Sequence, residues 1–470
     1  MVLRTPTTAD QTSPRILAGA ATSALIAWAA GVRADAIPDS VLRHAALVLA
    51  DNIAATVAAE AEPEVQAAQA RLTENSIAHE ATVFNRAGAR VDRYAAATAN
   101  GTAATWCELD EGYRLAPAHA GAYILPALLA EAETVNADTM SVLRALTLAY
   151  EIVGRNAQAF PFSAMTVHPH AAFGTLGAAA GIGLLRNYNA ETLLATVSAG
   201  ASMVFAGPYN HAIEGALVRN LWTGISAWAG MRAADLALLG LGGIAESGYD
   251  VFVGCFGTSA DPVALTSELG ERWAIASGYH KLFACCQYAH SAVEASLALS
   301  HRLTESGRTA NDITEIEVET HPRGLTLTET NPATVLSAKF SMPHAMAAVA
   351  ARGTGGQGAF GRDTLDDPAI ARLRHAVRLK PYAPIEPWPK DRPGRVTWRL
   401  SNGDAWTEAV ENARGGADQP LSTDEMLTKI DELTGAVFPA MAGVLRRLIA
   451  DPHAMASASW RELVADMTKR

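Results

Sequence analysis

Apolar residues recur at helical spacing over more than half of this chain, from about residue 15 to residue 275. One helix face carries Leu42, Ala46, Leu49, Ile53 and Val57, the spacing that a buried helix needs. Similar patterns cover 122–134, 138–153, 171–186, 190–205 and 219–239. Turn residues such as Gly207-Pro208 separate these segments. The pattern predicts an all-helical domain over 15–276, preceded by a flexible tail over 1–14.

The spacing of apolar residues changes after residue 277. A helix is predicted at 288–304, and a period of two follows, in which Ile316, Val318 and Thr320 alternate with glutamates. This alternation indicates a half-buried strand. A second strand over 396–400 runs into Asn402-Gly403, a strong hairpin signal, and a further helix is expected at 365–379. Residues 277–416 are therefore predicted to form a smaller α+β domain.

A helical pattern of apolar residues is found again near the end of the chain. Ser422 and Glu425 have the spacing of a capping box ahead of apolar helix positions. We expect residues 417–470 to rejoin the first domain. The predicted fold is mainly α, with a large helical domain built from both chain ends and an inserted α+β lid. A cleft between two such bodies is a common binding site.

The net charge and the cysteines indicate which kinds of binding partner and which cellular compartment to expect. The 470-residue chain has a net charge of −11, which disfavours nucleic acid and anionic membranes as partners. Its four cysteines show no disulfide framework, and no signal peptide or uninterrupted transmembrane segment is recognised. We expect a cytoplasmic protein that binds neither nucleic acid nor membrane.

The first polar cluster is acidic. Glu108, Asp110 and Glu111 crowd together, and His119 follows after a short loop. Such groups can shift one another's pKa values and serve acid–base chemistry. A solvated loop that caps the next helix is the alternative interpretation.

Histidines form the second cluster. His168 and His170 precede a Gly/Ala-rich helix, whose N-terminus favours a carboxylate ligand. With His119 they also allow a zinc site, although His-X-His spacing alone is weak support.

Two cations complete the set. Arg219 lies among small apolar residues, so it is either a buried carboxylate clamp or a surface charge. Lys281 stands at the predicted domain junction, where it can bind a carboxylate or, if desolvated, act as a base. The neighbouring Cys285 and Cys286 are expected to be buried thiols. No phosphate loop, dinucleotide fingerprint or nucleophile elbow is recognised.

Taken in order, these clusters resemble the landmarks of the MmgE/PrpD family. The specific segments are ANGTAATWCELDEG, HAGAYILPALLAEAE, HPHAAFGTLGAAAGIGLL, KLFACCQYAHSAVEA and AKFSMPHAMAAVAARG. The resemblance implies a helical domain formed by both chain ends, an α+β lid, and usually a homodimer. It also implies an active site between the domains that uses no metal or organic cofactor.

The resemblance carries site residues to this chain by position. It implies catalytic roles for His119, His168, Lys281 and Asp110. It implies substrate-binding roles for Arg219, Glu108, Glu111, Cys286, His290 and His344. Three of these replace other family residues: Arg219 a lysine, Cys286 a histidine and His344 a tyrosine. Thr105 also stands where many members have histidine. These changes either tune specificity or mark lost activity.

The function implied is cofactor-free lyase or isomerase chemistry on a small polycarboxylate, by proton abstraction beside a carboxylate. One of His119 and His168 would be the base and the other the acid. Dehydration is the first choice, with epimerisation and decarboxylation as alternatives. Two hypotheses from other classes are a metal-dependent hydrolase using His119, His168, His170 and Asp110, and a catalytically silent carboxylate-binding protein.

Overall fold

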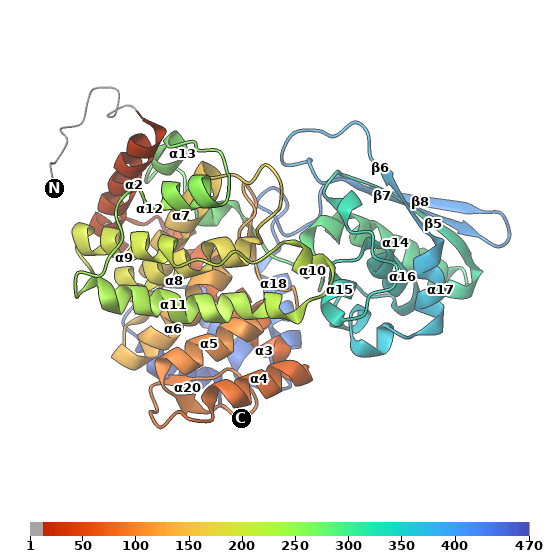
Figure 1. Ribbon diagram of the computed structural model, residues 1–470. Coiled ribbons are helices and arrows are strands. Elements are labelled where there is room, and N and C mark those ends of the chain that lie inside the picture. The colour runs from red at the N-terminus through yellow and green to blue at the C-terminus, as the bar shows by residue number, and fades with distance from the viewer. Residues whose placement is uncertain (1–12, 470) are drawn as a thin grey trace.

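The computed structural model describes residues 13–469 and is mainly α-helical (Figure 1). The long helices of the first half are α2 (Pro14–Gly31), α3 (Asp39–Ala58), α4 (Pro63–Thr73), α5 (Arg93–Ala104), α6 (Ala120–Val135), α7 (Thr139–Ala159), α8 (Pro169–Leu185), α9 (Ala190–Ser202) and α11 (Leu221–Ala237). Short helices are α10 (Asn210–Ile213), α12 (Ser247–Tyr249) and α13 (Val263–Thr266). The five helical segments predicted at 122–239 are confirmed as α6 to α9 and α11. Most of the predicted tail lies outside the described residues.

Helix α8 is the centre of the helical part. Every one of its residues is buried, and it packs against α6, α7, α9 and α11. Its alanines and glycines allow this, because small side chains on all faces let several helices approach one axis. Residue 168, at its N-terminal end, is therefore fixed by the best-packed element of the fold.

Two glycines bring α5 and α11 into close contact. A Cβ atom added at Gly101 would lie 2.7 Å from the Cα of Gly224, and one added at Gly224 would meet the backbone oxygen of Thr98. The backbones touch because neither position carries a side chain. Thr105 follows α5 directly and Arg219 precedes α11, so this crossing sets the distance between them.

The α+β part holds a four-stranded sheet of order β6-β5-β7-β8. Its strands are β5 (Ile313–Thr320), β6 (Val377–Pro381), β7 (Gly394–Leu400) and β8 (Ala405–Val410), and its helices are α14 (His290–Glu305), α15 (Val335–Lys339), α16 (Met342–Arg352) and α17 (Pro368–Ala376). β7 pairs antiparallel with β5 and β8, whereas β6 runs parallel to β5. The predicted hairpin is confirmed, with Gly403 at φ +92° in its turn.

Two sequence predictions were wrong in detail. The helix expected at 365–379 ends at Ala376, because Val377 starts the strand that pairs with β5. The segment predicted to be all-helical also contains the two-residue strands β1 (Ala81–Thr82), β2 (Arg90–Val91) and β3 (Gly112–Tyr113). β1 pairs with β2, and β3 pairs with β4 (Gly278–Tyr279), which follows that segment.

The C-terminal helices are α18 (Thr423–Thr434), α19 (Met441–Ala450) and α20 (Trp460–Met467). The predicted capping box of Ser422 and Glu425 is confirmed. α18 and α19 pack against α3, and α20 packs against α6, so the last helices lie beside the first ones (Figure 1). A division into two domains with boundaries near residues 277 and 417 remains a prediction.

Among the residues that the structure describes, one helical segment, Asp39–Ala61, is long and apolar enough to cross a membrane. Its most apolar 18-residue window is 83% buried within the protein. Its apolar side chains therefore belong to the core.

The glycine crossing makes a stability prediction. Gly224→Ala places a methyl group against the backbone of α5, and overpacking of this kind costs about 1–3 kcal/mol. We expect a lower free energy of unfolding by guanidinium titration. Gly31→Ala is the control, because no atom lies within 4 Å of an added Cβ there. An unchanged midpoint for Gly224→Ala would contradict this packing.

Candidate active site

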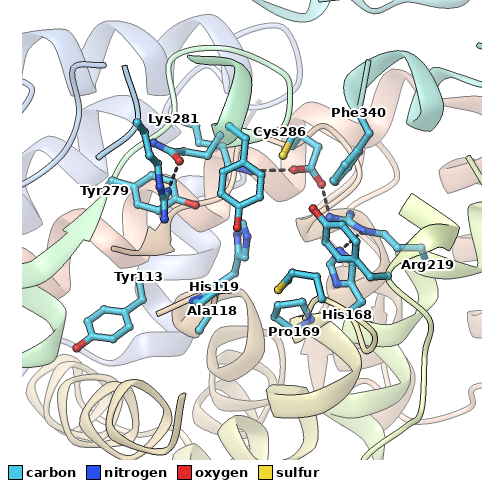
Figure 2. A pocket seen from close by; sticks show the side chains of 17 residues that line it. Tyr113, Ala118, His119, His168, Pro169, Arg219, Tyr279, Lys281, Cys286 and Phe340 are labelled. Atoms are coloured by element: carbon cyan, nitrogen blue, oxygen red, sulfur yellow. Dashed lines mark hydrogen bonds and ion pairs between the residues drawn. The ribbon is translucent and has the colours of Figure 1, made fainter. Parts of the chain in front are cut away.

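One pocket collects most of the polar residues predicted from sequence (Figure 2). Its polar and aromatic lining comprises Glu108, Tyr113, His119, His168, Tyr209, Arg219, Tyr279, Lys281, Cys286, Gln287, Tyr288, Phe340 and Arg392. These residues come from the acidic segment, the start of α8, the segment before α11, the β4 region and the α+β part. The pocket is thus assembled from segments distant in sequence.

The short pairing of β3 with β4 brings the acidic segment to Lys281. Gly112 lies opposite Tyr279 in this pairing. A Cβ atom at Gly112 would collide with the Tyr279 ring end, so any other residue here would displace Tyr279. The pairing places Glu108 and Asp110 on one side and Lys281, two residues after Tyr279, on the other.

Glu108 is the anion on which two buried cations converge. Its carboxylate pairs with the Arg219 guanidinium, and Lys281 Nζ lies 2.9 Å from Glu108 Oε2. All three side chains are at most 2% exposed. Burial alone would raise the pKa of Glu108, but the charges of Arg219 and Lys281 outweigh it and lower the pKa to about 2. Glu108 is therefore ionised at neutral pH.

Arg219 is engaged on several sides. Besides Glu108, it donates to the Thr105 carbonyl oxygen at 3.2 Å and to Asn220 Oδ1 at 3.0 Å. Its Nε lies 3.3 Å from His168 Nε2. The guanidinium thus faces protein groups on most of its edge. This arrangement suits a residue that positions its protein neighbours better than one that is free to bind a substrate carboxylate.

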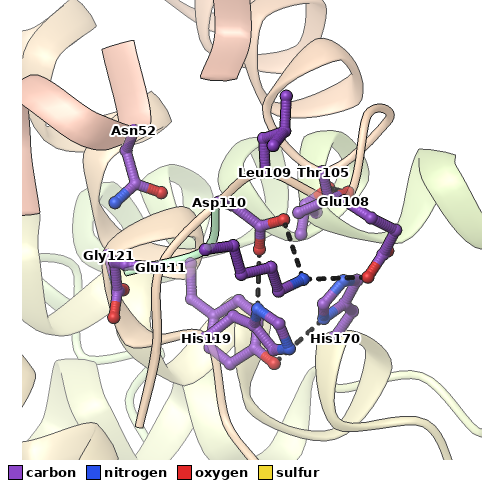
Figure 3. A network of polar contacts seen from close by, with 12 residues as sticks. Asn52, Thr105, Glu108, Leu109, Asp110, Glu111, His119, Gly121 and His170 are labelled. Carbon is purple, nitrogen blue, oxygen red and sulfur yellow. Dashed lines mark hydrogen bonds and ion pairs between the residues drawn. The ribbon is translucent and has the colours of Figure 1, made fainter. Parts of the chain in front are cut away.

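Asp110 and His119 form a second pair (Figure 3). His119 Nδ1 lies 2.7 Å from Asp110 Oδ2, and Lys281 Nζ is 3.7 Å from Asp110 Oδ1. Burial opposes ionisation of Asp110, yet Lys281 and His119 hold its pKa below the ordinary range. Asp110 thus faces the Nδ1 side of the ring, and His119 lines the pocket.

His168 and His170 are fully buried imidazoles. His168 caps α8, where its Nδ1 accepts from the His170 backbone N–H at 3.2 Å. His170 Nδ1 lies 3.0 Å from the Tyr123 hydroxyl oxygen. Burial, and then the charge of Arg219, lower the pKa of both rings well below the ordinary value. Both are neutral, and His168 is the one that lines the pocket.

Lys281 stays protonated. Burial opposes its charge, but Asp110 and Glu108 outweigh burial and raise the pKa of its ammonium group. This corrects the possibility that a desolvated Lys281 serves as a free base. It is instead a fixed positive charge facing the pocket.

Three predicted binding residues lie outside the pocket lining. Glu111 accepts from the Gly121 backbone N–H and from the Tyr150 hydroxyl group, and burial raises its pKa to about 8. His290 contacts the Cys285 carbonyl oxygen, and His344 contacts the Ala359 carbonyl oxygen. Their polar atoms are directed to the interior, so the structure does not bring them to the site. Cys286, in contrast, lines the pocket.

Sequence reasoning missed several pocket residues. Tyr279 and Tyr288 flank the Lys281 segment, which is the one signal that pointed to them. Tyr209 and Arg392 lie on irregular segments without periodicity or a motif, so no sequence signal singled them out.

The metal hypothesis has little geometric basis. Within residues 13–469, no group of three or more His, Cys, Asp or Glu side chains is arranged to hold a metal ion. The Nδ1 atoms of His119, His168 and His170 all face protein partners.

The fold and site are those of a mainly helical protein with a charged, histidine-lined pocket, and comparisons identify its family. The MmgE/PrpD N-terminal domain matches residues 23–258, and the MmgE/PrpD C-terminal domain matches residues 283–450. This chain belongs to the MmgE/PrpD family. It is 26% identical to cis-aconitate decarboxylase from Aspergillus terreus, over 88% of this chain and 89% of that protein. The sequence from strain NIH 2624 / FGSC A1156 gives the same values.

The depressed pKa of Glu108 predicts pH-dependent stability. In the folded protein the pKa is about 2, against 4.5 for the free group. The stabilisation, about 3 kcal/mol, is fully present above pH 4.5 and is lost as the pH falls towards 2. Glu108→Gln should therefore lower the free energy of unfolding by about that amount at pH 7 and by much less near pH 3.

Urea titrations at a series of pH values measure this difference. Glu315→Gln is the control, because it removes only a surface ion pair with Arg399, worth under about 1 kcal/mol. A Glu108→Gln effect that stays constant from pH 7 to pH 3 would refute the assignment.

Proposed function

We propose that this protein is a cofactor-free enzyme that moves a proton beside a carboxylate of a small polycarboxylate. The observation that carries the proposal is that His119 and the protonated Lys281 line one pocket, with Asp110 buried behind them and close to both. A base with a free nitrogen beside a fixed cation is what abstraction of an α-proton requires. The family membership and the decarboxylase relatives support the same class of chemistry.

The proposed first step is proton abstraction by His119. Asp110 holds the ring by Nδ1 and stabilises the imidazolium that forms, so Nε2 takes the proton. Lys281 has N–H groups beyond its contact with Glu108, and these stabilise the enolate-like charge that develops on the substrate carboxylate. His168 is neutral, so it serves as a second hydrogen-bonding imidazole rather than as a cationic acid.

What leaves after proton abstraction decides the reaction. Loss of hydroxide gives dehydration, and return of the proton on the other face gives epimerisation. Decarboxylation instead loses carbon dioxide and adds a proton to the carbanion that remains, for which a protonated His119 is the donor. We propose a lyase, with dehydration ahead of decarboxylation, and epimerisation as the alternative. We further propose that residues 277–416 act as a lid, since Lys281, Cys286 and Arg392 reach the pocket from this segment.

Deuterium incorporation tests the proposal. Proton NMR in D₂O with citrate-like, aconitate-like and aminosuccinate-like acids should show exchange beside a carboxylate for at least one acid. His119→Gln and Lys281→Met should reduce the exchange rate at least about a hundredfold, the lower range for a lost acid–base group. His453→Gln, an exposed histidine, is the control. Absence of exchange with the wild type, or loss of exchange on chelation, would reject the proposal.

We also propose that the protein is a homodimer that associates through α11. Ile225, Trp228 and Leu236 on α11, and Val218 in the short 3-10 helix just before it, are each 38–46% exposed. α11 runs along the outside of the helical part in Figure 1. Exposed apolar side chains gathered on one helix are typical of an interface, although Arg232 stands between Trp228 and Leu236 here. One helix facing its own copy satisfies two-fold symmetry.

Sedimentation velocity tests the interface. The wild type should sediment as a dimer at micromolar concentration, and Trp228→Glu as a monomer, because a buried unpaired carboxylate opposes association. Trp388→Glu is the matched control, since Trp388 has similar exposure but lies on the α+β part. A wild-type monomer, or a Trp228→Glu dimer, would exclude this interface.

A further inference from the structure

Three cations line the pocket, and two of them already face carboxylates. Arg219 and Lys281 pair with Glu108, and Lys281 also lies near Asp110. Two positive charges therefore meet two negative charges, and the inner cluster is close to neutral. An anionic substrate gains little net attraction from that cluster alone.

Arg392 is the third cation, and its position is fixed. It is 9% exposed and precedes β7 on an irregular segment. Its carbonyl oxygen accepts from the Ser291 hydroxyl group at 2.6 Å. Two residues later Gly394 packs against the backbone of Ala292, where an added Cβ would lie 2.6 Å from the amide nitrogen. The segment is thus held to the start of α14.

The guanidinium of Arg392 is held by uncharged groups. It donates to the side-chain oxygen of Gln287, and its central carbon lies 5.1 Å from the ring centroid of Tyr288. These contacts orient the group without neutralising it.

The neighbouring carboxylate, Asp391, is paired mainly with another arginine. Arg114 binds both of its oxygens, at 2.5 and 3.2 Å, whereas Arg392 Nε is 3.8 Å away. The fork with Arg114 has the geometry of a strong bidentate pair. The positive charge of Arg392 is therefore largely uncompensated at the pocket wall.

Tyr279 connects the two cationic regions. Burial raises the pKa of its hydroxyl group, and the charges of Lys281 and Arg392 both oppose this rise. Both cations thus act on one phenol that lines the pocket. A small molecule in this pocket can reach both.

We propose that Arg392 binds a second carboxylate of the substrate, while Lys281 holds the carboxylate beside the reacting carbon. This inference rests on the proposed function and deepens it, because it requires a substrate with at least two carboxylates. Arg392 also orients the substrate, so that the carbon next to the Lys281-bound carboxylate faces His119. A monocarboxylate satisfies only one of the two positions.

Calorimetric titration with succinate and butyrate tests this subsite, because the two probes share four carbons and differ by one carboxylate. The wild type should bind succinate more tightly. Arg392→Gln should weaken succinate binding at least about tenfold, or 1.4 kcal/mol, and leave butyrate binding within about twofold. Arg392→Lys should restore part of the difference. Arg395→Gln is the control, because Arg395 pairs with Glu319 away from the pocket lining.

The outcomes separate the subsite from the reaction. Equal binding of both probes by the wild type, or equal weakening of both by Arg392→Gln, overturns the subsite. A succinate preference that depends on Arg392, without deuterium exchange for any acid, keeps the subsite and rejects the proposed function. Exchange with a KM that Arg392→Gln leaves unchanged keeps the function and rejects the subsite.

Discussion

The buried ion pairs of Glu108 hold the site together. Arg219 and Lys281 are both buried, and burying two cations without an anion would be costly. Glu108 provides that anion from a left-handed backbone conformation, at φ +54°, which is costly for a residue other than glycine. The two ion pairs offset that cost. Because Lys281 also lies near Asp110, the same cluster fixes the carboxylate that orients His119.

The sequence was most informative where structure is local. Helices α6 to α9 and α11 follow from apolar periodicity, and the β7–β8 hairpin follows from Asn402-Gly403, because each signal lies within a short window. β6 was missed because Val377 pairs with Ile316, which is 61 positions earlier. The β3–β4 pairing was missed for the same reason, although it brings Gly112 to Tyr279. Such pairings depend on the tertiary fold rather than on local propensity.

The residues of the candidate site show the same difference between local and long-range information. His119, His168, Arg219 and Lys281 were predicted because they stand in polar clusters that resemble a family. Clustering does not say which way a side chain points, however. Glu111 is adjacent to Asp110, yet it faces Tyr150 and the start of α6, whereas Asp110 faces His119. Arg392 shows the reverse case, since an irregular segment without any motif carries a buried cation to the pocket.

Arginine at position 219, where the family resemblance implies lysine, changes what this position can do. A guanidinium presents five donors in one plane, and Arg219 binds Glu108, Thr105 and Asn220 while its Nε faces His168. An ammonium group is a compact point charge with three donors and lacks this planar arrangement. Arg219 therefore fixes the carboxylate and the imidazole around it. In the proposed mechanism His119 takes the proton, whereas Lys281 remains a fixed positive charge, and Asp110 lies close to both.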